Sequence, residues 1–347
     1  MKECGYLTED SNWQVTTEAR SINIDIFRMV LAQWVIFAHL GPALFSIPTV
    51  PGRLAVWCFF ILSGYLNAKS FQHRLMSGYL MAAKGYYLSR IKRIYPLLLL
   101  SCLVVCFALG TVYINDWYVL FPYQYSYTGE LSNGVLWTLI VEIQLYLITP
   151  LLFIGACQLK GLHLIGKWIL GLSLVFLVPL INVYLTGNRD LIDDRTVAGN
   201  VGFYFFGMML FLGGSCRFEL TRNVYRILCI LVTLIGAYFL IKYNFVTQGV
   251  QFTIGPFITF TLSLLIIASI KPIFTKGHMI FRFLGFYTYE IYVMHGLMVF
   301  LSYQANATSA FSIILFWWCL PLLIVIVFDM CFKKKYKQIF NTVERNE

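Results

Sequence analysis

The apolar residues of this chain form long blocks, and this arrangement constrains the fold more than any other feature. Within the blocks, polar residues do not recur at a helical or strand period. A block of about 20 apolar residues has the length that an α-helix needs to span the hydrocarbon core of a bilayer. We count ten blocks, at residues 24–46, 54–68, 94–114, 134–157, 165–186, 199–215, 226–243, 252–270, 282–302 and 310–332.

These blocks predict an all-α polytopic membrane protein with about ten transmembrane helices. Only 12% of the residues are charged, against about 25% in soluble domains. A large soluble helical protein is excluded, because it could not cover so many apolar helices with polar surface. The second and sixth blocks are short and contain glycine, so tilted or broken helices are open alternatives there.

The distribution of lysine and arginine predicts the orientation. With the N-terminus inside, 21 of the 26 basic residues fall in cytoplasmic stretches, four fall in external loops, and Arg28 lies within a span. Basic loops prefer the cytoplasm, so both termini are predicted to be cytoplasmic. The domain boundaries follow: an N-terminal tail at 1–23, a transmembrane domain at 24–332 and a basic C-terminal tail at 333–347. The same bias explains the net charge of +10 without a nucleic-acid partner.

Two shorter segments carry expectations of their own. Residues 69–93, between the second and third blocks, mix basic and aromatic side chains. This composition predicts a separate interfacial helix on the cytoplasmic face. The first 20 residues are polar and acidic without an apolar core, so no removable signal peptide is expected there.

Three titratable side chains fall at similar depths in three different blocks. His39 lies about seven residues from the outer end of its block, Glu142 about eight and His295 about seven. Titratable groups at membrane depth are costly and often functional. Histidine can act as a general base near neutral pH, because its ordinary pKa is about 6.5. A hydrogen-bonded core histidine at position 39, and a polar bridge between the helices of Glu142 and His295, are the structural alternatives.

Three arginines form a complementary set near the predicted inner face. Arg28 precedes His39 by eleven residues, which puts both on one helix face about 16 Å apart along the axis. Arg90 and Arg93 stand just before the third block. Guanidinium groups bind phosphate in a bidentate manner, so a nucleotide-bearing donor such as a coenzyme A thioester suits this end. The alternative is that Arg90 and Arg93 only determine topology.

Five motifs occur in a fixed order along the spans. They are Arg28 followed by His39, Phe-Phe-Ile-Leu-Ser-Gly-Tyr at 59–65, Arg-Ile-Lys-Arg-Ile-Tyr-Pro at 90–96, Trp-Thr-Leu-Ile-Val-Glu-Ile-Gln-Leu-Tyr at 137–146, and Thr-Tyr-Glu-Ile-Tyr-Val-Met-His at 288–295. In these motifs the chain resembles the acyltransferase 3 family of membrane-bound bacterial O-acyltransferases, which modify surface polysaccharides, lipopolysaccharide and related glycans. The resemblance runs from about residue 20 to 332. Thr138, Leu145 and Thr288 replace the family's usual Ser, Phe and Ser, which are conservative departures.

The resemblance implies an enzyme of the bacterial inner membrane. It would transfer an acyl group, acetyl in the first instance, from cytoplasmic acyl-CoA to a hydroxyl of a cell-surface glycan or its lipid-linked precursor. Acetyl-CoA would be a co-substrate, succinyl-CoA the other donor considered, and no cofactor would be permanently bound. The partners would be the lipid bilayer, the glycan acceptor and the polysaccharide biosynthesis machinery.

Each candidate residue then has a role in this hypothesis. The catalytic candidates are His39 as general base or covalent acyl carrier, Glu142 to orient His39 or bind the acceptor, and His295, with Tyr292, to bind or polarise the acyl carbonyl. The acyl-CoA-binding candidates are Arg28, Arg90 and Arg93. Ser63, Tyr292 and Trp137 are substrate-pocket candidates. Ser63 also fits a nucleophile, although a Ser-Gly pair in a spanning helix is more typical of close helix packing.

Two functions without catalysis compete with this hypothesis. A transporter of polysaccharide or lipid-linked glycan would also have many spans and buried charges, but it typically shows repeated halves, and none is evident here. A non-catalytic partner of a polysaccharide synthase would keep the fold without the histidine chemistry. No metal site is predicted, because the five histidines are scattered without ligand spacing.

Overall fold

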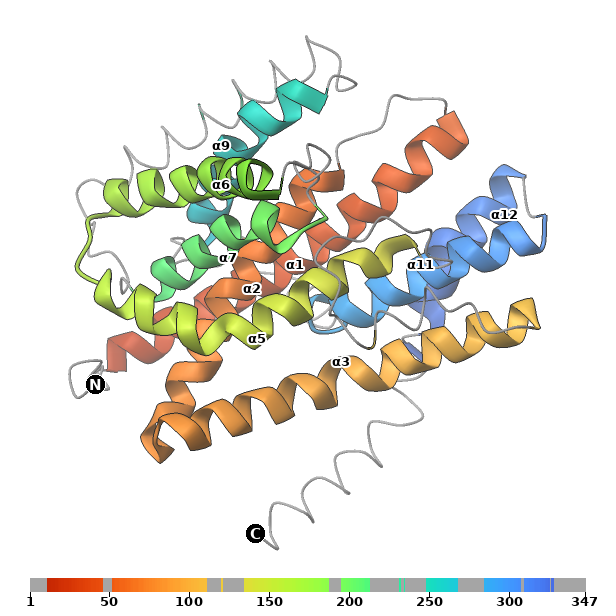
Figure 1. Ribbon diagram of the computed structural model, residues 1–347. Helices are drawn as coiled ribbons and strands as arrows, with labels where there is room; N and C mark the ends of the chain where they lie inside the picture. Colours follow the sequence, from red (N-terminus) through yellow and green to blue (C-terminus); the bar gives the residue numbers. More distant parts are fainter. Residues whose placement is uncertain are drawn as a thin grey trace, which may run out of the picture.

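The described part of the protein is helical throughout, as expected from the sequence. The computed structural model describes residues 11–45, 52–110, 120, 134–186, 195–212, 231, 234, 248–267, 284–306, 309–324 and 326–327. No strand occurs in these residues. The main elements, drawn in Figure 1, are α1 (Ser11–Phe45), α2 (Gly52–Arg74), α3 (Tyr79–Leu109), α5 (Trp137–Gln158), α6 (Leu164–Thr186), α7 (Val197–Leu212), α9 (Gln248–Ile267), α11 (Thr288–Gln304), α12 (Ala310–Ile314) and a π-helical turn, η5 (Leu315–Cys319).

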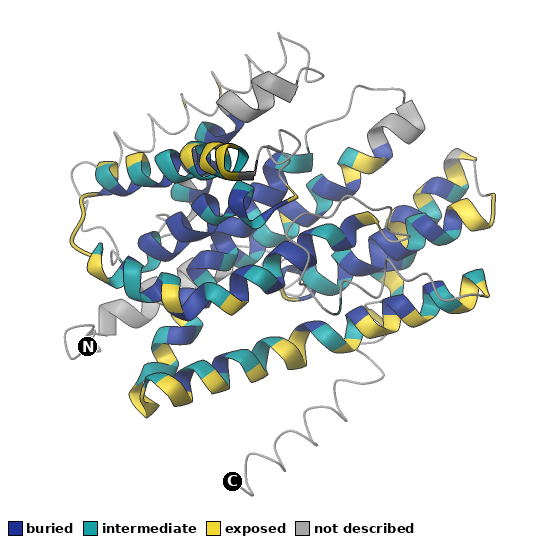
Figure 2. Ribbon diagram, viewed as in Figure 1, coloured by how far each residue is buried: buried dark blue, intermediate teal, exposed yellow. Residues whose placement is uncertain are grey.

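Helices α2 and α7 form the centre of the bundle. Both carry buried residues around most of their circumference, and Figure 2 shows them as its most continuously buried helices. Their backbones touch: a Cβ atom at Gly64 would overlap the carbonyl oxygen of Tyr204, and one at Gly207 would overlap that of Ile61. Small residues permit such close crossings, so the Ser-Gly pair in α2 contributes to helix packing through its glycine.

Helix α3 differs from the sequence-based expectation. The separate interfacial helix predicted for residues 69–93 is wrong, because residues 69–74 complete α2 and α3 begins at Tyr79 and continues to Leu109. The chain turns between α2 and α3 at Gly78, whose φ of 89° favours glycine. Helix α3 borders the bundle along one side (Figure 1). Its outward face carries large exposed apolar residues: Leu80, Met81, Leu88, Ile91, Leu99, Leu100, Leu103 and Phe107.

Four helical segments of the described chain are long and apolar enough to cross a membrane: Gly52–Ser77, Tyr79–Leu109, Gly134–Gln158 and Leu164–Leu185. The first of them extends well beyond the short block at 54–68 that the sequence indicated. Exposed apolar residues on α3 and α6 add to the membrane character. The block at 226–243 falls almost entirely, and the tail at 333–347 wholly, outside the described residues. The count of ten spans and the orientation of the termini stay predictions.

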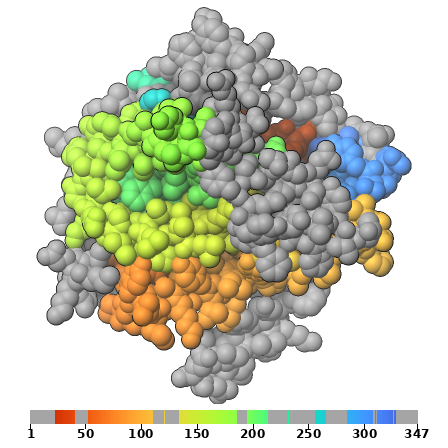
Figure 3. Space-filling model, viewed as in Figure 1, coloured from red at the N-terminus to blue at the C-terminus, as the bar shows by residue number. Residues whose placement is uncertain are grey.

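Two clusters of packed apolar residues lie next to the candidate functional residues. Helices α5, α6 and α7 lie together on the face drawn in Figure 3 and belong to the large central core. A smaller cluster joins α1, α11 and the 310–319 segment through Ile36, Leu40, Ile291, Ile313 and Trp317. The first cluster borders a cavity, and the second lies beside a pair of histidines, His39 and His295.

Candidate functional site

A cavity opens among α1, α2, α3, α5 and α11. It encloses about 850 Å³ when the space open to the outside is counted. Six of the nine residues singled out in the sequence line it: Arg28, Ser63, Arg90, Arg93, Glu142 and Tyr292. The rest of its wall consists of hydroxyl groups, the Asn67 amide and apolar side chains, the last mainly from α2. One space therefore collects three cations, one carboxylate and several hydroxyl groups.

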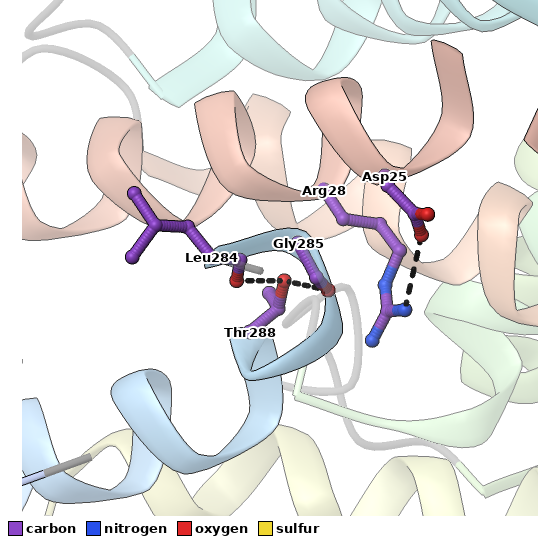
Figure 4. Close-up of polar contacts among 5 residues, drawn as sticks. All are labelled: Asp25, Arg28, Leu284, Gly285 and Thr288. Carbon is purple, nitrogen blue, oxygen red and sulfur yellow. Dashed lines mark hydrogen bonds and ion pairs between the residues drawn. The ribbon is translucent and has the colours of Figure 1, made fainter. Parts of the chain in front are cut away.

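Arg28 enters the cavity from α1. Its guanidinium lies 4.0 Å from the Asp25 carboxylate, and Figure 4 shows it extending past the 284–288 turn that precedes α11. This turn is held against α1, because Gly285 packs on the backbone carbonyl of Asp25 and a Cβ atom there would overlap it. The Thr288 hydroxyl donates to the Gly285 carbonyl at 2.7 Å. The start of α11 thus has a fixed position beside Arg28.

Arg90 and Arg93 reach the cavity from α3. The Arg90 guanidinium carbon lies 5.1 Å from the ring centroid of Tyr86 and 5.5 Å from that of Tyr146. Its buried Nε atom has no hydrogen-bond partner among the described residues. Aromatic faces hold a guanidinium in place without occupying its N–H groups, which suits binding of an anionic ligand. The Arg93 side chain is exposed at the rim.

Helix α3 is tied to α11 at the level of these arginines. The Tyr289 hydroxyl donates to the backbone carbonyl of Ile94 at 2.7 Å, and both residues line the cavity. Because Ile94 follows Arg93 directly, this hydrogen bond fixes the register of the arginines relative to α11.

Glu142 sits on the wall formed by α5 and α2. Its Oε1 atom accepts a hydrogen bond from the Ser63 hydroxyl at 2.9 Å and another from the Tyr146 hydroxyl. The Asn67 amide donates in turn to the Ser63 oxygen at 3.1 Å. Ser63 is therefore part of a polar network as well as a neighbour of the Gly64 crossing. The structure joins Glu142 to Ser63 and Tyr146, and it places His39 elsewhere.

This network continues into the core, away from the cavity. The Tyr86 hydroxyl donates to the Asn67 side-chain oxygen at 3.0 Å and lies 3.2 Å from the Thr149 hydroxyl. Thr149 and the Tyr204 hydroxyl are 2.6 Å apart. Buried polar groups are stable only when they are paired, and here the pairs connect α2, α3, α5 and α7.

His39 and His295 form a second group. Their ring centroids are 5.4 Å apart, with the planes tilted by 51°. His295 is fully buried and His39 is exposed. Neither lines the cavity, but Tyr292, one helical turn before His295, does. The Tyr292 hydroxyl accepts from Thr138 at 3.1 Å and donates to the Val135 carbonyl at 3.3 Å.

Trp137 precedes Thr138 at the start of α5. It is partly buried against the central core, and the Arg195 guanidinium carbon lies 5.9 Å from its ring centroid. Trp137 does not line the cavity. Its contact with Arg195 places it near the residues that precede α7 rather than beside Arg28, Arg90 and Arg93.

Several residues in these groups were missed by sequence reasoning. Asn67 and Tyr86 are polar residues within or next to apolar blocks, and their spacing alone gives no contact. Trp317 is a second case: its carbonyl accepts from His295 Nδ1 at 2.7 Å. The signal that could have indicated it is the adjacent pair of tryptophans, residues 317 and 318, in an apolar block.

Comparison with known proteins identifies the family. The profile of the acyltransferase 3 family, described as an acyltransferase domain, matches residues 21–332. The chain is 26% identical over 306 residues to an O-acetyl transferase of Shigella phage Sf6, which covers 78% of this chain and 82% of that protein. It is 27% identical over 232 residues to nodulation protein 10 of Rhizobium leguminosarum bv. viciae, covering 54% of this chain and 58% of that protein. No solved structure matches. The family resemblance noted in the sequence is confirmed, and the chain belongs to the acyltransferase 3 family.

Proposed function

We propose that this protein transfers an acetyl group from cytoplasmic acetyl-CoA to a hydroxyl of a cell-surface glycan or its lipid-linked precursor. The observation that carries the proposal is the cavity itself. It gathers Arg28, Arg90 and Arg93 at one end and reaches Tyr292, one turn from the His39–His295 pair, at the other. A long donor with phosphates at one end and a thioester at the other fits this division.

The arginines supply the phosphate end. CoA carries its negative charge on the nucleotide and pyrophosphate, and arginine binds such groups through a planar fork of N–H donors. Arg90 is braced by two tyrosine rings, and Arg28 lies on a helix that is fixed to the start of α11. Arg93 is exposed, so it is the arginine that a charged donor meets on entry.

The histidine supplies the reacting end. Arg28 and His39 belong to the same helix, eleven residues apart, so the axial rise between them is about 16 Å. The pantetheine arm would run along α1 and α11 between these points. His39 is exposed and titratable, so it would take the proton of the acceptor hydroxyl as general base. Glu142, through Ser63 and Tyr146, would hold the wall of the donor cavity.

The relatives support the choice of acetyl and of an oxygen acceptor, since one of them is named an O-acetyl transferase. Membership of the family supports the further proposals of a glycan acceptor, a place in the bacterial inner membrane and a link to polysaccharide biosynthesis. Succinyl-CoA is the alternative donor. A transporter of polysaccharide or lipid-linked glycan could also use a cavity with arginines, but neither it nor a non-catalytic partner of a polysaccharide synthase would need the histidine pair.

The test is acyl transfer from radiolabelled acetyl-CoA to membrane glycans. Wild type, His39→Ala and the control His73→Ala would be compared in membranes with matched protein levels. His73 is an exposed histidine at the end of α2, outside the cavity. We expect label with wild type and His73→Ala and none with His39→Ala. An active His39→Ala variant would refute the general-base role, and unlabelled glycans with both acetyl-CoA and succinyl-CoA would refute the enzyme.

A further inference from the structure

The two ring nitrogens of His295 differ in their hydrogen bonding. Nδ1 lies 2.7 Å from the backbone carbonyl oxygen of Trp317. A carbonyl only accepts hydrogen bonds, so Nδ1 must carry the proton. In the neutral ring, which full burial favours, Nε2 then holds a lone pair. This buried Nε2 atom has no hydrogen-bond partner among the described residues. His295 therefore has no free N–H group with which to polarise an acyl carbonyl.

The Trp317 carbonyl is free to accept because of the sequence that follows it. In an α-helix this carbonyl would receive the N–H of the residue four positions later. That residue is Pro321, which has no N–H. The helix widens here into the π-helical turn Leu315–Cys319, and such turns are frequent at functional sites. Pro321 thus leaves an acceptor that His295 occupies.

The same turn braces both histidine-bearing helices. The Trp317 indole N–H donates to Ser302 on α11 at 2.7 Å. The Trp318 indole N–H donates to Gln33 on α1 at 2.7 Å, and its ring packs 6.2 Å from that of Phe37. Two adjacent tryptophans therefore hold α1 and α11 to one short segment. This arrangement sets the separation of His39 and His295.

We propose that His295 is a positioning residue that orients His39 by accepting an N–H from it at Nε2. The proposal rests on the general-base role of His39 in the proposed function. Two imidazoles joined by an N–H···N bond of about 3 Å have ring centroids little more than 5 Å apart, close to the observed 5.4 Å. Rotation of the exposed His39 ring about its side-chain torsions would complete the bond. The nitrogen of His39 that remains unprotonated then faces the acceptor.

The proton balance is simple. The acceptor oxygen forms a bond to the acyl carbon as its O–H proton passes to the free nitrogen of His39. The imidazolium formed there keeps its other N–H on His295 Nε2, which disperses the charge. When the C–S bond breaks, His39 returns the proton to the CoA thiolate. An ester and a thiol leave, and both histidines regain their resting states.

Amide substitutions at position 295 separate this role from a merely structural one. The asparagine side chain of His295→Asn would keep a donor near the place of Nδ1 and lose Nε2, so this variant should fold normally and lose transfer. In His295→Gln the amide oxygen can take the place of Nε2, so this variant should retain more transfer than His295→Asn. A structural role predicts the reverse order. We expect kcat for His295→Asn to fall about 100-fold, with the KM for acetyl-CoA nearly unchanged because His295 lies outside the cavity.

Pro321→Ala is the independent variant. The alanine would supply a backbone N–H that competes with His295 for the Trp317 carbonyl, while favouring the helix. We expect a stable protein with kcat about tenfold lower, although both histidines are present. A wild-type kcat in either His295→Asn or Pro321→Ala would overturn the proposal that His295 positions His39. If the position-295 variants do not fold, kcat of Pro321→Ala alone decides. Inactivity of the wild type with any acyl-CoA would instead refute the proposed function, so the two failures are distinguishable.

Discussion

Substitution of Arg90 distinguishes a role in donor binding from a role in membrane topology more clearly than substitution of the neighbouring basic residues does. Its guanidinium faces the cavity between the rings of Tyr86 and Tyr146. If it contacts a CoA phosphate, Arg90→Ala removes a charged hydrogen bond worth about 1.5–3 kcal/mol. This loss corresponds to a rise of about 10- to 100-fold in the KM for acetyl-CoA. Loss of the two ring contacts costs about 0.5–1 kcal/mol each in stability, which should leave the fold intact.

The matched control is Lys92→Ala. Lys92 lies two residues away on the same helix, is exposed and does not line the cavity. Both substitutions remove one positive charge from the same turn of α3, so an effect through topology or net charge would be equal. We expect the KM to rise for Arg90→Ala and to change less than about twofold for Lys92→Ala. Arg90→Lys should be intermediate, because it keeps the charge and loses the planar fork.

Donor truncation completes this experiment. Acetyl-pantetheine keeps the thioester and lacks the nucleotide and its phosphates. Wild type should use it with a much higher KM, and Arg90→Ala should add no further penalty. The reasoning is refuted if Arg90→Ala and Lys92→Ala have equal effects, or if Arg90→Ala raises the KM for acetyl-pantetheine as much as that for acetyl-CoA.

Two other substitutions test the walls of the site. Glu142→Ala leaves the hydroxyls of Ser63 and Tyr146 without their acceptor and should lower stability by about 2–4 kcal/mol. Glu142→Gln keeps an acceptor oxygen and should lower the stability less. Thermal unfolding in detergent would measure both effects. Equal melting temperatures for the two variants would contradict this. Gly64→Ala forces α2 and α7 apart and should lower stability by about 1–3 kcal/mol or more. Gly134→Ala, whose Cβ would meet no described atom within 4 Å, should leave the stability unchanged. A Gly64→Ala protein as stable as Gly134→Ala would mean that the helices do not cross this closely.

The sequence predicted features that depend on one helix at a time. The length of the apolar blocks predicted helices, and eleven residues between Arg28 and His39 predicted a shared face. These predictions need only the helical repeat. The error at residues 69–93 came from composition, because basic and aromatic residues at a membrane boundary look alike whether the helix lies flat or continues into the next span. Whether this helix continues as α3 depends on its contacts with neighbouring helices. Composition carries no information about those contacts.

Contacts between helices were beyond the reach of a single sequence. Equal depth indicated that His39, Glu142 and His295 belong together, and depth says nothing about which faces meet. The structure pairs His39 with His295 and places Glu142 with Ser63 and the arginines. Pro321 shows the same limit. Its missing N–H is readable from the sequence, but the group that uses the freed carbonyl lies on another helix, 26 residues earlier in the chain.

In the proposed function, the separation of the cavity from the histidine pair determines where the thioester of the donor would lie. The residues that line the cavity come from α1, α2, α3, α5 and α11, whereas the apolar residues packed near the histidines come from α1, α11 and the 310–319 segment. Two helices connect the two groups: α1 carries both Arg28 and His39, and α11 carries both Tyr292, which lines the cavity, and His295. Because helix rise fixes the separation of Arg28 and His39 along α1, a donor held by its phosphates, as proposed, would present its thioester at a set distance along this helix. Binding energy gained far from the reacting atoms would thus be used to place the acyl carbon beside His39, while contacts of Trp317 and Trp318 outside the cavity hold the two histidine-bearing helices.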